Sequence, residues 1–198
     1  MRRVVITGQG AISALGHTAP TTMEGMREGR CAIGDLTMRD VERLSIGIGG
    51  QVQSYDEKAH FTRQELTFFD RFTQFALIAG QEAVTQAGLE IDEATALRAG
   101  GVVATSGGGW HTVDDNYRTV YEEGKNRVRP FVVPRELNNA AASHLSMRHD
   151  LRGPGFTVAT ACASSNHAMG QAFHMIQSGM ADVMLTGGTE SMLVFGGI

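Results

Sequence analysis

Cysteine is scarce in this chain of 198 residues, with only Cys31 and Cys162, far apart in sequence. A disulfide framework needs more cysteines and an oxidising compartment, so we expect none here. Neither a CxxC pair nor an HExxH motif occurs, which leaves a zinc site without support. The sequence therefore predicts no metal.

Long apolar runs and long runs of one charge are also missing. No stretch approaches the ~18 apolar residues that a membrane helix needs, and the short apolar run after the first two arginines does not make a secretory signal. A formal net charge of -4, from 17 basic and 21 acidic residues, disfavours a general nucleic-acid-binding surface. We predict a cytoplasmic protein with neither a membrane nor a nucleic acid as partner.

The chain does contain alternating strand-like and helix-like segments, in a globular composition that is 42% hydrophobic and 19% charged. Buried strands are predicted at 2–8, 98–109 (which ends in a glycine loop), 156–160 and 181–188. Helices are predicted at 23–30, 63–87, 111–124, 136–151 and 164–179, with a basic loop at 125–135. Because the strands are apolar on both faces and alternate with helices, we expect one α/β domain, with a parallel or mixed sheet between helical layers.

The helix at 63–87 has the clearest signals at its ends. Thr62 and Glu65 form the T-x-x-E pattern of a capping box, which satisfies free backbone N–H groups at a helix start. Apolar residues then recur at steps of three and four, and Gly88 suits the position just after the helix. This helix is expected in a core or an interface.

The segment "VVITGQGAIS" (4–13) carries a G-x-G after a predicted strand, as dinucleotide-binding loops do. Ser13 stands where the third glycine belongs, and no acidic residue ends a plausible second strand near position 30. The glycines therefore favour a tight turn and close helix–strand packing, and we predict no cofactor.

The segment "FTVATACASSNHAMG" (156–170) places Cys162 between a predicted strand and a predicted helix. A thiol at a helix N-terminus lies at the positive end of the helix dipole, which favours the reactive thiolate. The same backbone N–H groups can receive an oxyanion formed at a carbonyl. This is the logic of a nucleophile elbow built around sulfur. The alternative is that the cysteine is a small buried hydrophobic residue.

A general base for that thiol is not found nearby. His167 follows five residues later, about 500° around a helix of ~3.6 residues per turn, so it points elsewhere. His174 lies three turns along the helix, and His111 and His144 approach only through an unknown fold. The local sequence supplies a nucleophile without its base.

Several motifs together resemble the N-terminal half of a β-ketoacyl-[acyl-carrier-protein] synthase of the elongating type, within the thiolase-like superfamily. They are "VVITGQGAISALG", "SGGG", "PFVVP" and "GPGFTVATACASSNHAMGQAFHMIQSGMADVMLTGGTE". The resemblance covers nearly the whole chain. It implies a layered α-β-α-β-α fold of two similar halves, of which residues 1–198 are approximately the first.

The resemblance also implies a reaction. Cys162 matches the residue that takes an acyl group as a thioester, before decarboxylative condensation with malonyl-acyl carrier protein in fatty acid biosynthesis. Two histidines serve that condensation in the family, and their motifs belong to the C-terminal half. We therefore expect the missing base beyond residue 198, and the 198-residue chain alone to be inactive in condensation.

Further positions carry over from the same resemblance. Gly107 and Gly108 match a glycine loop that lines the acyl pocket, where a glycine at 108 is expected to deepen the acyl tunnel. Phe131 and Val132 match a segment that reaches across a homodimer, and strand 156–160 matches one paired across its axis. The positions that match contacts to the acidic acyl carrier protein are Arg63, Lys125, Arg127 and Arg129. For the last three, a solvated loop is the alternative.

Other functions stay open at this stage. A polyketide-type ketosynthase has a "TACSSS"-like elbow, close to "TACASS" here. A thiolase shares the layered fold but acts on acyl-CoA. A non-catalytic dimerisation or scaffold subunit is the alternative from another class.

Overall fold

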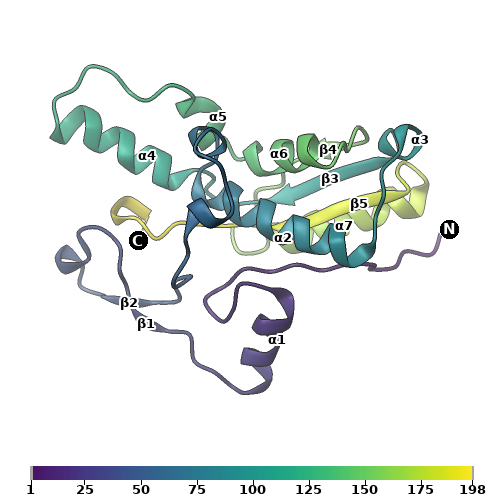
Figure 1. Ribbon diagram of the computed structural model, residues 1–198, viewed down its shortest axis with the longest axis horizontal. Coiled ribbons are helices and arrows are strands. Elements are labelled where there is room, and N and C mark those ends of the chain that lie inside the picture. The colour runs from purple at the N-terminus through teal and green to yellow at the C-terminus, as the bar shows by residue number, and fades with distance from the viewer. Residues whose placement is uncertain (1, 198) are drawn as a thin grey trace.

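The computed structural model describes residues 2–197, built around a three-stranded parallel sheet (Figure 1). The strands are β4 (Gly155–Phe156), β3 (Ala99–Ala104) and β5 (Val183–Gly188), side by side in that order. A separate antiparallel pair joins β1 (Gly34–Asp35) to β2 (Ile48–Gly49).

Seven α-helices occur among the described residues, and none of them combines the length and apolar character needed to cross a bilayer. They are α1 (Ala19–Arg27), α2 (Arg71–Ala87), α3 (Glu93–Ala96), α4 (Trp110–Tyr117), α5 (Val132–Glu136), α6 (Ala140–Arg148) and α7 (Ser164–Ser178). A π-helical segment, η4 (Arg118–Glu122), continues α4. Single 3₁₀ turns are η1 (Val41–Arg43), η2 (Glu57–Ala59), η3 (Glu65–Thr67) and η5 (Phe195–Gly197).

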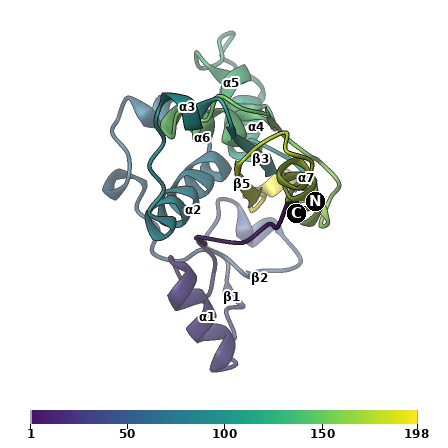
Figure 2. The ribbon, with the colours of Figure 1, turned by 90° about the vertical axis from the view of Figure 1, so that its right-hand side faces the viewer.

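Strand β3 is the centre of the core, because all six of its residues are buried. Side chains alternate between its faces. Val103 packs in a cluster with Phe72 and Leu77 of α2 and with α6, whereas Val102 packs with Ala168 of α7. Figure 2 shows α2 and α6 on one side of β3 and β5, with α7 on the other. The predicted parallel sheet between helical layers is confirmed.

The predicted helix at 63–87 is broken into two pieces. The capping box forms: Thr62 N–H donates to Glu65 Oε2 over 2.9 Å, and Glu65 N–H donates to Thr62 Oγ1 over 3.3 Å. It starts only the turn η3, and α2 begins at Arg71 behind its own N-cap, Asp70. Gly88 ends α2 with φ +57°, as predicted.

The predicted strand at 2–8 is wrong. These residues join no sheet, and 87% of Ile6 is exposed. Residues 4–10 and β5 both line a cavity of about 600 Å³ and do not pair with each other. Gly8 and Gly10 instead lie against α2, where an added Cβ would collide with the carbonyl oxygens of Ala83 and Ala79. The predicted close packing against a helix is confirmed for both glycines, although the segment that carries them is not a strand.

The other boundaries shift by a few residues. The predicted strand at 156–160 is reduced to β4, with one isolated bridge between Thr160 and Cys162. The helix predicted at 23–30 begins earlier, because Thr18 caps α1 by accepting the Thr21 N–H over 3.2 Å. Segment 125–135 contains α5 at its end, and the helix predicted at 136–151 is α6.

Candidate active site

Cys162 lies on a sharp turn that joins β4 to α7. The preceding Ala161 has φ +50°, a left-handed conformation that costs a non-glycine residue roughly 1 kcal/mol or more. Ser164 holds the turn: its hydroxyl donates to the Ala161 carbonyl over 2.6 Å and accepts the Thr160 N–H over 2.8 Å. Backbone strain held in place by such bonds is typical of functional turns.

The thiol of Cys162 is free and exposed, just ahead of the first residue of α7, Ser164. The structure therefore does not support the alternative of a buried hydrophobic cysteine. Ala163, the N-cap of α7, has no side chain that could accept from the first turn. The backbone N–H groups at that helix end have no side-chain cap, so they can receive an oxyanion.

The histidines named as possible bases make their contacts elsewhere. His167 and His174 are exposed on α7. His111 Nε2 lies 3.0 Å from Ser191 Oγ, and the His144 ring stands edge-on to Phe69, with 4.7 Å between ring centroids. Within residues 2–197, no hydrogen bond joins Cys162 to a histidine.

Three half-buried histidines should make the stability of the fold depend on pH. Burial lowers the pKa of His111, His144 and His149 below the usual 6.5, with a further contribution from Arg71 for His111 and from Arg148 for the other two. Their pKa values are depressed in the fold, so their contribution to stability is present above about pH 6.5 and is lost as pH falls through the lowered pKa values.

Thermal unfolding followed from about pH 7.5 to pH 5 should therefore show a falling Tm. The variant His111→Gln should flatten part of that slope, and His174→Gln, at an exposed position, should leave it unchanged. A Tm that stays constant over this range would contradict the prediction.

The glycine loop after β3 is too crowded for side chains at two of its positions. Gly108 has φ +68°, and a Cβ added to it would lie 2.5 Å from Asn138 Oδ1 and 2.6 Å from the Glu136 carbonyl oxygen. A Cβ on Gly107 would collide with Trp110 Nε1. These contacts require glycine whatever the loop binds, so the acyl-pocket role of both residues stays a prediction.

The substitution Gly108→Ile should accordingly destabilise the fold by about 2 kcal/mol or more, since it adds a backbone collision to the strain of positive φ. Gly124→Ala is the matched control, because Gly124 has φ +63° with nothing within 4 Å of an added Cβ. It should cost only about 1 kcal/mol. Urea denaturation measures the free energy of unfolding of both variants. Equal losses would show that steric crowding at position 108 adds nothing to the cost of the substitution.

Glu190 joins this loop to the end of β5. Its carboxylate accepts hydrogen bonds from Thr105 Oγ1 over 3.1 Å, from the Ser106 N–H over 2.8 Å and from the Ser106 hydroxyl. Glu190 is not among the site residues predicted from the sequence. An acidic residue two positions after the predicted strand at 181–188, at the edge where parallel strands end, was the available signal.

The remaining predicted site residues divide between a cavity and the open surface. Arg63, Arg129 and Phe131 line a cavity of about 460 Å³. Phe131 has φ +65°, and its ring lies 4.6 Å from that of Phe68 between centroids. Val132, a half-buried residue, begins α5.

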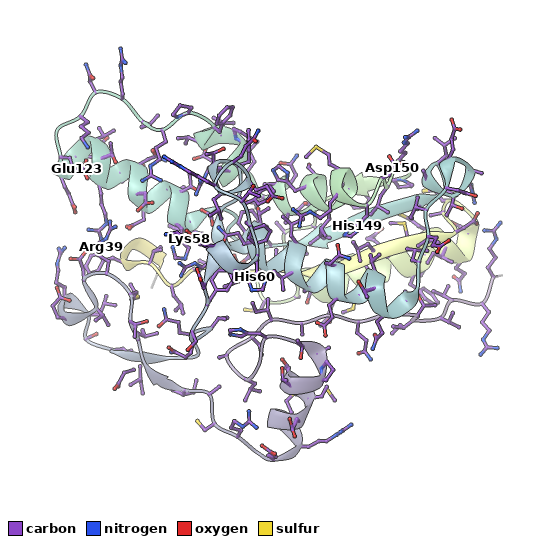
Figure 3. All side chains as sticks on the ribbon, in the orientation of Figure 1. Arg39, Lys58, His60, Glu123, His149 and Asp150 are labelled. Atoms are coloured by element: carbon purple, nitrogen blue, oxygen red, sulfur yellow. The ribbon has the colours of Figure 1, made fainter. Side chains whose placement is uncertain are left out.

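Lys125 and Arg127 are exposed in the loop that follows η4. Lys125 Nζ pairs with a carboxylate oxygen of Glu123 over 2.6 Å, at the end of the molecule where Figure 3 labels Glu123. Neither of these residues lines the cavity, and Cys162 does not line it either. The structure thus brings together only some of the residues matched to the carrier protein.

Parallel strands between helical layers, with an exposed cysteine on a tight turn before a helix, define a layered α/β protein. Residues 1–198 match the family model described as "Beta-ketoacyl synthase, N-terminal domain". The chain belongs to the beta-ketoacyl synthase family.

Named relatives agree with this assignment. The chain is 42% identical over 194 residues to "Nodulation protein E" of Rhizobium sp. (strain N33), covering 98% of this chain and 48% of that protein. It is 37% identical over 190 residues to "3-oxoacyl-[acyl-carrier-protein] synthase 2" of Staphylococcus aureus (strain COL), covering 96% of this chain and 46% of that protein. The chain thus spans about half the length of the curated relatives it matches.

A solved structure described as "The ishigamide ketosynthase/chain length factor" has the same fold. It superposes with a TM-score of 0.88 at 27% sequence identity, covering 98% of this chain and 49% of that one. The expected thiolase-like α/β fold is confirmed.

Proposed function

We propose that residues 1–198 form the N-terminal half of a 3-oxoacyl-[acyl-carrier-protein] synthase, and that Cys162 is its nucleophile. The observation that carries the proposal is the position of the Cys162 thiol, exposed on a strained turn directly before the uncapped start of α7. The name of the staphylococcal relative supports the reaction and the carrier protein.

The proposed reaction has two steps. The Cys162 thiolate attacks the carbonyl carbon of an acyl-carrier thioester, the carrier thiol leaves with a proton, and the acyl group remains on sulfur as a thioester. Malonyl-carrier then loses carbon dioxide, and the carbanion so formed attacks the Cys162 thioester. The products are a 3-oxoacyl-carrier and the free Cys162 thiolate. The histidines for this second step are expected from the C-terminal half of the protein.

The partners belong to the same proposal. Arg63, Lys125, Arg127 and Arg129 are exposed and basic, which suits an acidic carrier protein. A homodimer, with Phe131 and Val132 near its interface, follows from the family resemblance. The cytoplasm stays the predicted compartment, and fatty acid synthesis the predicted pathway.

A polyketide-type ketosynthase is the second candidate, and the likeness to the ishigamide ketosynthase/chain length factor favours it. Acyl chains of different kinds separate the two. Transfer of saturated acyl groups to Cys162 would favour fatty acid synthesis, whereas preferential transfer of 3-oxoacyl groups would favour polyketide synthesis.

Covalent labelling tests the proposal directly. The complete protein is incubated with an acyl-carrier thioester, and the adduct is located by intact mass and peptide mapping. One acyl group per chain on Cys162 is expected. Cys31 is an internal control, because it is also a free, exposed thiol but lies on no such turn. An inert Cys162, or equal labelling of both cysteines, would favour a non-catalytic scaffold subunit.

A further inference from the structure

Four arginines line the 460 Å³ cavity: Arg63, Arg71, Arg129 and Arg135. Arg63 precedes α2 and Arg71 begins it, whereas Arg129 lies in the loop before α5 and Arg135 lies in α5 itself. Ion pairs in the described part of the chain involve other basic residues and none of these four. The cavity thus gathers guanidinium groups that have no carboxylate partner.

Arg135 is held firmly in this arrangement. Its Nη1 donates to the Leu66 carbonyl oxygen over 2.8 Å, and its Nε donates to Thr112 Oγ1 over 3.1 Å. The Thr112 hydroxyl in turn donates to the buried carboxylate of Asp70 over 2.6 Å. Burial lowers the pKa of Arg135 below its usual value, because its charge is held partly out of water. A charge placed in this way gains from an anion brought beside it.

Neither carboxylate of the cavity, Glu57 or Asp115, forms an ion pair with these arginines. From further away both of them, and the buried Asp70, attract Arg135, but burial has the larger effect on its pKa. Asp115 faces Arg39 instead, with 3.7 Å between Oδ1 and Nη1 (Figure 3 labels Arg39). Glu57 accepts a hydrogen bond of 3.5 Å from Gln74 Nε2. The lining of the cavity therefore has four guanidinium groups against two carboxylates, with an excess of positive charge.

The remaining wall is partly apolar, formed by Leu66, Pro130 and Phe131. A volume of about 460 Å³ falls within the range of roughly 300–1,000 Å³ found for small-molecule sites. A protein partner needs a broader surface, and the exposed Arg127 and Lys125 lie outside the cavity.

We propose that this cavity binds a small oxyanion, a phosphate or a carboxylate, that carries a short apolar group. Arginine forks match both anions in bidentate geometry. The anion lies among the guanidinium groups, and its apolar group lies against Phe131 and Leu66. The site lies away from Cys162, which does not line the cavity, although Arg63 and Arg129 are also proposed contacts of the carrier protein.

Calorimetric titration of the complete protein tests this site, with sodium chloride at matched ionic strength as the blank. Phenyl phosphate, benzoate and inorganic phosphate are the probes. Phenyl phosphate should bind more tightly than inorganic phosphate because of the apolar wall, and comparison with benzoate identifies which of the two anions the site prefers.

Single charge removals show which arginines contribute to the site. Arg71→Gln and Arg129→Gln should each weaken the binding of phenyl phosphate about tenfold, the scale of one charge-assisted hydrogen bond. Arg127→Gln is the matched control, because it removes the same charge from the same loop outside the cavity. It should change affinity less than twofold, and thermal unfolding verifies that every variant folds.

Three results would overturn the proposal. One is no binding of any probe above the salt blank, and another is an equal loss of affinity in Arg127→Gln and Arg129→Gln. The third is that an acidic carrier protein binds through these arginines while the small anions do not. Acylation of Cys162 in the unchanged protein is read separately, so failure here leaves the proposed function standing.

Discussion

Replacing Cys162 with serine in the complete protein is expected to slow acyl transfer about a thousandfold or more. Sulfur is a much stronger nucleophile than a hydroxyl oxygen, and a serine hydroxyl is a weak nucleophile without a base beside it. Single-turnover acylation by a saturated acyl-carrier thioester, followed by intact mass, measures the effect.

The matched control is Cys31→Ser. This change removes the other free and exposed thiol, and the acylation rate should stay within about twofold of the unchanged protein. If Cys162→Ser were still acylated at the original rate, another residue would be the nucleophile. The position of Cys162 would then no longer support the proposed function.

The largest effect on stability is expected for Asp70→Ala, about 3 kcal/mol or more. The fully buried Asp70 carboxylate caps α2 by accepting the Phe72 N–H over 3.4 Å, and it accepts the Thr112 N–H and hydroxyl over 2.7 and 2.6 Å. Alanine would leave these buried donors without a partner and would free Thr112 from the chain of bonds that reaches Arg135. Urea denaturation measures the loss.

Asp92→Ala serves as its control, because Asp92 is also an N-cap aspartate but lies on the surface, where its carboxylate accepts the Thr95 N–H over 2.8 Å. Water replaces a bond lost at the surface, so this loss should be clearly smaller. Comparable losses in the two variants would mean that the buried network around Asp70 adds nothing beyond a helix cap.

Much of the fold was predictable because its signals are local. The buried run of β3, the strand β5 and the helix α7 each have their pattern within their own residues. The strand expected at 2–8 failed because pairing depends on a partner distant in sequence, and residues 4–10 line a cavity with β5 instead of pairing with it. The capping box of Thr62 and Glu65 formed, but a local motif cannot reveal that the helix stops after one turn.

The candidate site was predictable to the same degree. The position of Cys162 follows from one continuous segment. The arginine cavity does not follow from one segment. Arg63 and Arg71 are more than fifty residues away in sequence from Arg129 and Arg135, and only the fold brings them together. The buried role of Asp70 was hidden for the same reason, since its partner Thr112 lies in α4.

The carboxylate of Glu190 has a practical consequence for engineering this family. The Glu190 carboxylate accepts hydrogen bonds from the backbone N–H and the hydroxyl of Ser106. It therefore ties the segment after β3 to the segment after β5. A graft that exchanges residues 105–109 between relatives should therefore carry residues 186–191 from the same donor. Chimeras that mix the two parental sources would place an acidic side chain against a loop of the wrong shape.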